Sequence, residues 1–337
     1  MSFDSSPDFS AIPLFDMQQF VSHDLAVRDQ FVTRLRDVCH HVGFFYIKNH
    51  GISSQLLGKI LVLTAAFFNL SQEEKDAIRI SLSPHYRGYG RLGAETTEGK
   101  ADYKESYDLG LEQRARPVSA EQPYRILQGP NQWPASTLLA KLHWQETVLE
   151  YIAAMQVLGQ QLMRAISLTL GFSADYFVNQ FCANAEDSYA ILRLLRYPPG
   201  RVNGKHQAPE LGVGPHVDFG CLVMLLQDQV GGLQVQNCSG QWIDAPPIKD
   251  TLVINIGHML QIWSNNYFLA TPHRVINVSE KIRHSVPFFF EPNLSTVVSP
   301  LNIPSPLLMQ MNRPHVDPQT QVVYGKHMLK IYHRSFQ

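Results

Sequence analysis

The stretch Pro215-His216-Val217-Asp218-Phe219-Gly220 decides the fold class, because it places an imidazole and a carboxylate inside a series of short β-rich runs. Before residue 188 the chain carries long helical patterns, and after it the runs are short and separated by turn signals. Strands at such even spacing are typical of an all-β sandwich or jelly roll, which we predict here. The runs cover residues 191–197, 221–226, 233–236, 242–245, 251–256, 274–278 and 284–290.

Three polar residues in this β-rich part have the chemistry of a metal site. Side chains two apart on a strand point to the same face, so His216 and Asp218 would lie side by side. His273, in Thr271-Pro272-His273-Arg274-Val275, opens another predicted strand. Two histidines and one carboxylate form the facial triad that leaves positions open for substrate and dioxygen on non-haem Fe(II). We predict that His216, Asp218 and His273 bind one Fe(II) ion, although a His-x-Asp tripeptide alone would be a weak signal.

A carboxylate anchor follows the third ligand on the next predicted strand. In Arg283-His284-Ser285 the first and third side chains share a face, whereas His284 points to the opposite one and is not expected to be a ligand. A guanidinium fork beside a hydroxyl is suited to gripping a carboxylate with two hydrogen bonds. A metal with an open edge next to such an anchor indicates a 2-oxo acid that chelates iron.

The N-terminal half predicts helices around fewer strands. Apolar spacing predicts a helix over 25–41 and another after Ser53, with a buried strand at 44–47 between them. Residues 81–135 are expected to be loops with one strand around 106–109, and Ser136 to open a long helical region that Gly171 ends. The Pro-rich tail should end in a helix from about Tyr324. We predict one domain over 1–337, comprising regions 1–187, 188–300 and 301–337.

Composition limits the compartment and the partners. The chain has 337 residues, 45% of them hydrophobic and 17% charged, with a formal net charge of −1, so a nucleic-acid or anionic-membrane partner is not indicated. Four cysteines without a CxxC pair are expected to be buried and inert in a reducing compartment. The N-terminus has no signal-peptide pattern, and no apolar run is long enough for a membrane span. We therefore expect a cytoplasmic protein.

Taken in order, these motifs resemble the 2-oxoglutarate/Fe(II)-dependent dioxygenases of the isopenicillin N synthase-like family, over nearly the whole chain. The resemblance implies a double-stranded β-helix, or jelly roll, flanked by helices, with an N-terminal α/β extension and a C-terminal helix beside the mouth of the site. The segments that carry it are Val42-Gly43-Phe44-Phe45, Asn49-His50-Gly51, Arg87-Gly88-Tyr89, Lys104-Glu105-Ser106-Tyr107, 192–199, His216-Val217-Asp218, 231–235, Trp263-Ser264-Asn265, His273-Arg274-Val275 and Arg283-His284-Ser285.

The resemblance also implies a reaction and a cosubstrate site. Iron at the triad would use dioxygen and 2-oxoglutarate to oxidise a C–H bond of a small molecule, by default through hydroxylation, releasing succinate and carbon dioxide. Arg283 and Ser285 would bind the distal carboxylate of 2-oxoglutarate. Tyr197 matches a tyrosine that often contacts this cosubstrate, but it could equally be a core aromatic residue.

Substrate contacts are harder to predict. Arg193 sits where some relatives place a substrate-facing side chain, and on a strand it shares a face with Tyr197. Phe219 and Phe289 could wall the pocket or belong to the core. Relatives usually carry an acidic residue where this chain has His258, which we interpret as a turn residue rather than a fourth polar group of the site. Further charged groups expected near the mouth are Lys104, Glu105 and Arg87.

Three other interpretations stay open at this point. An oxidase of the isopenicillin N synthase type would keep the Arg-x-Ser pair but use no 2-oxoglutarate. A zinc hydrolase could use the same ligands, although no nearby general base is evident. A binding module on a jelly roll would need no metal triad. The substrate could be an amino acid, a nucleobase-like ring or a secondary metabolite.

Overall fold

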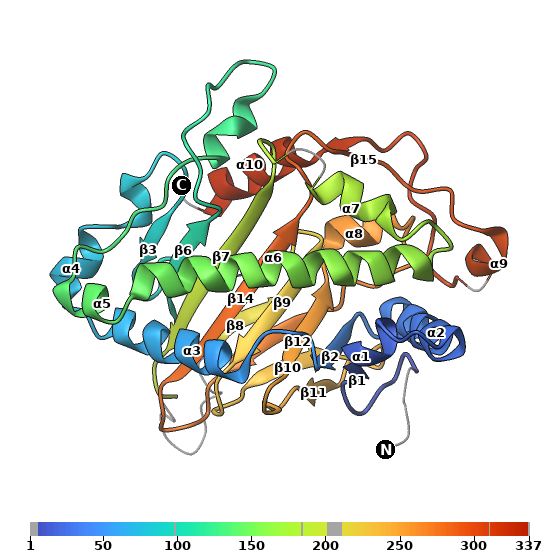
Figure 1. Ribbon diagram of the computed structural model, residues 1–337, viewed down its shortest axis with the longest axis horizontal. Coiled ribbons are helices and arrows are strands. Elements are labelled where there is room, and N and C mark those ends of the chain that lie inside the picture. Colours follow the sequence, from blue (N-terminus) through green and yellow to red (C-terminus); the bar gives the residue numbers. More distant parts are fainter. Residues whose placement is uncertain (1–5, 98, 183–184, 201–210, 310, 336–337) are drawn as a thin grey trace.

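The computed structural model describes residues 6–97, 99–182, 185–200, 211–309 and 311–335. Its core contains a larger and a smaller β-sheet (Figure 1). The eight-stranded sheet has the order β1 (Leu14–Asp16), β2 (Phe44–Lys48), β12 (Leu252–Ile256), β9 (Leu222–Gln227), β14 (Arg283–Glu291), β7 (Tyr189–Tyr197), β6 (Glu105–Gly110) and β3 (Gly88–Gly90). The four-stranded sheet has the order β11 (Trp242–Asp244), β10 (Leu233–Gln236), β13 (His273–Ile276) and β8 (Leu211–His216). This arrangement confirms the expected β-rich core.

Helix α6 (Trp144–Thr169) runs across the outer face of the large sheet (Figure 1). Its buried stripe includes Val148, Ile152 and Met155, which cover the apolar face of the central strands. The helix comes so close to β14 that a Cβ atom at Gly159 would lie 2.6 Å from the ring of Phe290. Even-numbered residues of β14 therefore pack under helices, and the odd-numbered ones face the opposite side of the sheet.

Other helices confirm or correct the expectations. Helices α2 (Leu25–His41) and α3 (Ser54–Phe68) form as predicted, and the Ser53 hydroxyl accepts a hydrogen bond from the Leu56 amide. The helical region expected from Ser136 is present and consists of two helices, because His143 adopts a left-handed conformation with φ of 51°. The shorter of the two is α5 (Thr137–Lys141). Smaller helices are α1 (Met17–Phe20), α4 (Gln72–Asp76), α7 (Asp175–Cys182), α8 (His258–Trp263) and α9 (Ser305–Leu308).

The segment 81–135 contains more strands than expected. Beside β6 and β3, it forms the hairpin β4 (Thr96–Thr97) and β5 (Lys100–Ala101). Such short strands carry no readable period, because their pairing partners rather than their own sequence define them. The C-terminal helix α10 (Tyr324–Ser335) begins at the predicted residue, after the short strands β15 (Val297–Val298) and β16 (Val322–Val323) pair.

The free cysteines differ in burial. Cys39 and Cys221 are buried as expected, but Cys238 is exposed, because it lies in the turn after β10. The side chain of Cys182 is outside the described part of the chain. Within the described residues, no helix has the length and apolarity needed to cross a membrane.

Candidate metal and cosubstrate site

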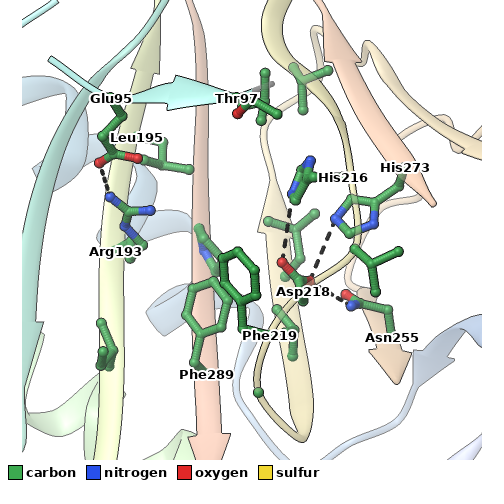
Figure 2. A pocket seen from close by; sticks show the side chains of 18 of the residues that line it. Glu95, Thr97, Arg193, Leu195, His216, Asp218, Phe219, Asn255, His273 and Phe289 are labelled. Carbon is green, nitrogen blue, oxygen red and sulfur yellow. Dashed lines mark hydrogen bonds and ion pairs between the residues drawn. The ribbon is translucent and has the colours of Figure 1, made fainter. Parts of the chain in front are cut away.

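The three predicted metal ligands meet where two strands of the small sheet pair. His216 ends β8 and His273 begins β13, and the two residues are direct partners in the antiparallel ladder. The Nε2 atoms of His216 and His273 lie 3.6 and 3.5 Å from the two carboxylate oxygens of Asp218 (Figure 2). Asp218 is not on the strand as expected, because β8 ends at His216 and the carboxylate comes from the loop that follows. The three ligand atoms lie within 4.8 Å of one another, which suits one metal ion.

Backbone carbonyls fix the orientation of both imidazoles. Nδ1 of His216 lies 2.9 Å from the carbonyl of Gly214, and Nδ1 of His273 lies 3.2 Å from the carbonyl of Thr271. A carbonyl can only accept, so each Nδ1 carries the proton and each Nε2 keeps its lone pair for a metal. The donor set of two imidazole nitrogens and one carboxylate matches what Fe(II) binds in non-haem oxygenases.

Burial and neighbouring charges shift the pKa values of the three triad residues in different directions. Burial lowers the pKa of His273 to about 4, with a further contribution from His216. Burial also opposes protonation of His216, but hydrogen bonding and attraction to Asp218 outweigh it and raise the pKa of His216. For Asp218, burial is outweighed by the neighbouring histidines, which hold its pKa below the usual range. A proton therefore competes with a metal for the Nε2 lone pair more strongly at His216 than at His273.

We expect Fe(II) affinity of the apoprotein to fall as pH falls through the pKa of His216, which lies above the usual 6.5. One proton must then leave for each ion bound, so affinity should drop about tenfold for each pH unit. Below about 4, His273 is protonated as well and the slope should steepen. Titrating anaerobic apoprotein with Fe(II) at several pH values measures this slope. A flat affinity between about pH 6 and pH 8 would contradict it.

Asn255 is a site residue that the sequence interpretation missed. Its side-chain amide donates to Asp218 at 2.7 Å and holds the carboxylate toward the histidines (Figure 2). The signal was present as a lone amide in the otherwise apolar strand Leu-Val-Ile-Asn-Ile, where a buried polar group needs a partner.

Replacing Asn255 by alanine should weaken Fe(II) binding about 10- to 100-fold, the usual loss when a hydrogen-bond partner of a metal ligand is removed. The measurement is an Fe(II) titration of apoprotein. Asn237→Ala serves as the control, because it removes a buried amide whose hydrogen bonds lie elsewhere, with Phe9 and Gln241. Equal Fe(II) affinity in the two variants would show that Asn255 does not support Asp218.

Helix α8 holds the loop that carries Asp218. The backbone N–H groups of His258 and Met259 donate to the carbonyls of Asp218 and Gly220 at 2.7 and 3.0 Å. Gly257 allows this approach, because a Cβ there would lie 2.2 Å from the Gly220 carbonyl oxygen. His258 was expected in a turn, but it begins α8 and lines the same cavity as the triad.

Arg283 and Ser285 face the same cavity as the triad. Arg283 is fully buried, donates to Ser285 at 3.2 Å and to Gln227 at 3.0 Å, and lies 4.7 Å above the ring of Tyr197. No carboxylate of the described residues forms an ion pair with it, and its Nε has no hydrogen-bond partner. A buried unpaired cation is costly, so this guanidinium fits a ligand carboxylate. Gln227 escaped prediction, because only its cross-strand pairing with Ser285 brings it to Arg283.

These groups line a cavity of about 790 Å³, a size that small-molecule sites commonly have. Arg193, Phe219 and Phe289 line it too, and 54% of the Phe219 surface is exposed. From the C-terminal helix α10, Met328 and Ile331 reach the same space. The cavity thus brings the predicted metal, cosubstrate and substrate positions into one chamber.

A charged network forms the wall opposite the triad. Arg193 pairs with Asp108 at 2.8 Å and with Glu95, which comes from the segment that leads into the β4–β5 hairpin (Figure 2). Lys104 pairs with Glu95 at 3.1 Å and with Asp102, and all five side chains line the cavity. The expectation for two other charged residues was wrong. Glu105 is buried against Lys75 and Arg196, and Arg87 is buried against backbone carbonyls such as that of Leu127, both outside the cavity.

Comparison with known proteins places this site in a family. The model for the non-haem dioxygenase in morphine synthesis N-terminal domain matches residues 12–136, and that for the 2OG-Fe(II) oxygenase superfamily matches residues 179–292. A homoarginine-6-hydroxylase of Glycine max is 38% identical, over 88% of this chain and 89% of that protein. The chain belongs to the 2-oxoglutarate/Fe(II)-dependent dioxygenases. Within them it is of the isopenicillin N synthase-like group.

Further relatives of this dioxygenase agree. A 2-oxoglutarate-Fe(II) type oxidoreductase of Emericella nidulans is 35% identical, over 84% of this chain and 80% of that protein. A full-length Neurospora crassa protein, solved in complex with alpha-KG, superposes with a TM-score of 0.83 at 27% identity, covering 99% of both chains. JOX2 in complex with 2OG, Fe and JA superposes with a TM-score of 0.70 at 27% identity, covering 95% of this chain and 85% of that one. The double-stranded β-helix is thereby confirmed.

This dioxygenase uses Fe(II), 2-oxoglutarate and dioxygen to oxidise a small molecule. Of the interpretations left open by the sequence, the findings favour the 2-oxoglutarate-dependent reaction over the oxidase of the isopenicillin N synthase type. They also identify an oxidoreductase rather than a zinc hydrolase or a binding module.

Proposed function

We propose that this dioxygenase hydroxylates a C–H bond of a small molecule that carries a basic nitrogen, such as a basic amino acid. Substrate, 2-oxoglutarate and dioxygen would become the hydroxylated product, succinate and carbon dioxide. The observation that carries the substrate class is the charge of the cavity wall, where Glu95, Asp102 and Asp108 outnumber Lys104 and Arg193. A chamber with an excess of carboxylates favours a cationic guest.

The names of relatives support this substrate class. Homoarginine-6-hydroxylases of Glycine max, Oryza sativa and Arabidopsis thaliana are 35% to 38% identical to this chain. Their substrate is an amino acid with a basic side chain, which is one of the classes that the sequence left open.

The proposed roles of the residues near the metal follow from their contacts. His216, Asp218 and His273 would hold Fe(II), which when bound supplies the chemistry that turns dioxygen into an oxidant able to break a C–H bond. Arg283 and Ser285 would bind the distal carboxylate of 2-oxoglutarate. Tyr197, whose ring lies under the Arg283 guanidinium, would pack against that end of the cosubstrate.

The substrate roles rest on position in the cavity. Arg193 is held between Asp108 and Glu95 and would orient a polar group of the substrate. Phe219 and Phe289 would flank its carbon chain and exclude water from the reacting carbon.

A turnover screen tests the proposal. Purified enzyme with Fe(II), 2-oxoglutarate and oxygen is offered homoarginine, arginine, lysine, thymine and a neutral aliphatic acid, and succinate formation is measured. Basic amino acids should stimulate succinate formation most, with a product heavier by one oxygen atom. Preference for neutral or anionic compounds would overturn the substrate class.

We also propose that residues 1–337 act as one catalytic domain in a reducing compartment such as the cytoplasm. The unpaired state of Cys39, Cys221 and Cys238 supports such a compartment. Fractionation of cells that express the tagged protein tests the location, and recovery from an oxidising compartment would contradict it.

A further inference from the structure

One cavity carboxyl has no role in the site described so far. Glu291 ends β14, the strand that begins with Arg283 and also carries Phe289. Residues 283, 285, 287, 289 and 291 all line the cavity, as the alternation along a strand requires. Glu291 is only 2% exposed, so its carboxyl is removed from solvent, and the residue lines the chamber that contains the candidate metal triad.

Glu291 differs from the other carboxyls of the cavity in its partners. Asp102 pairs with Lys104, Asp108 pairs with Arg193, and Glu95 pairs with both of these cations. Asp218 lies between the two histidines of the triad. In the part of the chain that the structure describes, Glu291 is the cavity carboxyl without a cationic partner.

The groups that contact Glu291 are neutral, and the nearby carboxylate of Asp218 repels its negative charge. The backbone N–H of Cys221 donates to its Oε2 at 2.8 Å, and the Tyr324 hydroxyl gives its anion some further stabilisation. Its Oε1 lies against the backbone of Gly220, where a Cβ atom would be 1.8 Å away. Because nothing offsets desolvation fully, burial raises the pKa of Glu291 to about 8. A cation placed in the cavity would remove this penalty.

We propose that Glu291 binds the basic side-chain group, a guanidinium or ammonium, of the substrate. This inference rests on the proposed function and deepens it by naming the residue that selects the cation. Glu291 touches the loop that carries Asp218 and Phe219, so a cation bound there brings the adjacent carbon atoms of the substrate close to the metal. The charged network around Arg193 is left to bind the polar end of the molecule.

The hydrogen bond from Cys221 would also be present if Glu291 had a purely structural role. In that role Glu291 would only position the loop of Asp218, and its charge would not matter. The isosteric variant Glu291→Gln separates the two, because its amide oxygen still accepts from the Cys221 N–H but carries no charge. Glu291→Asp keeps the charge on a shorter side chain and provides a second variant.

The experiment compares a charged and a neutral ligand of the same shape. Homoarginine and its ureido analogue, which replaces the guanidinium by a neutral group, are titrated into the anaerobic enzyme with Fe(II) and 2-oxoglutarate, and binding is measured by calorimetry. In Glu291→Gln, homoarginine should bind at least about 30-fold more weakly, as expected when one member of a buried charge pair is removed. The ureido analogue should bind no worse than to wild type.

Controls separate the possible failures. Fe(II) affinity is measured in Glu291→Gln as well, and Glu112→Gln, which removes an exposed carboxylate outside the cavity, should bind homoarginine like wild type. Equal homoarginine affinity in Glu291→Gln and wild type overturns the role of Glu291 while leaving the proposed function intact. Loss of Fe(II) affinity in Glu291→Gln assigns the residue to the loop instead. If wild type binds and oxidises no basic compound, both the proposed substrate class and the proposed role of Glu291 are wrong.

Discussion

Replacing His216 by alanine should abolish the formation of succinate from 2-oxoglutarate. The variant removes one of the three proposed protein ligands, and His273 and Asp218 alone would hold an ion poorly. Because loss of a group that merely supports a ligand costs about 10- to 100-fold, loss of the ligand itself should exceed about 100-fold in iron affinity and activity. The measurements are iron content of anaerobically loaded protein and succinate formed per enzyme.

His23→Ala is the matched control, because it removes an exposed imidazole outside the cavity. It should retain iron and turnover. Thermal unfolding of the two apoproteins should be similar, since the His216 side chain is half-buried and its backbone partner is a single carbonyl. Full turnover in His216→Ala would contradict the assignment of His216 to the metal centre.

Replacing Arg283 by leucine should raise the KM for 2-oxoglutarate by about 30- to 5000-fold. The side chain is completely buried, and truncating one partner of a buried charge pair costs about 2–5 kcal/mol. Arg283→Lys keeps a charge but loses the planar fork, so its KM should lie between wild type and leucine. Steady-state kinetics with varied 2-oxoglutarate measures the effect.

Arg274→Leu provides the comparison for the loss of an arginine. Arg274 stacks on Trp242, with its guanidinium carbon 4.1 Å from the ring centre, and lies on β13, the strand that begins with His273, but outside the cavity. Its KM for 2-oxoglutarate should stay close to that of wild type. An unchanged KM in Arg283→Leu would mean that the cosubstrate carboxylate binds elsewhere.

Local patterns were sufficient for much of the fold. Alternation and turn signals located the strands of the core, and a serine cap located α3. Patterns failed where a neighbour decides the conformation. The break at His143 depends on one left-handed residue, and β4 and β5 are two residues each, too short to show any period.

In the site, too, residues with a local sequence signal could be predicted, and residues positioned by distant parts of the chain could not. Its three candidate ligands and the Arg283–Ser285 pair were readable because each has a chemical type and a spacing that suits its task. Glu95 was not, because 98 residues separate it from Arg193 in the chain and only the folded structure brings them together. Gln227 was missed because cross-strand register brings it to Arg283, and Asn255 because its partner Asp218 lies in a distant loop.

The length of β14 fixes the distance between two charged residues that line the cavity. Arg283 stands at one end and Glu291 at the other, and the rise of a strand sets roughly 26 Å between their backbones. Inserting one residue between Ser285 and Phe289 would turn the far half of the strand inside out, whereas exchanging Phe289 would alter only the space between the ends. Substitutions toward the far end of β14 can therefore change which substrates fit, while the position of Arg283 stays the same. One scaffold can in this way serve many different substrates.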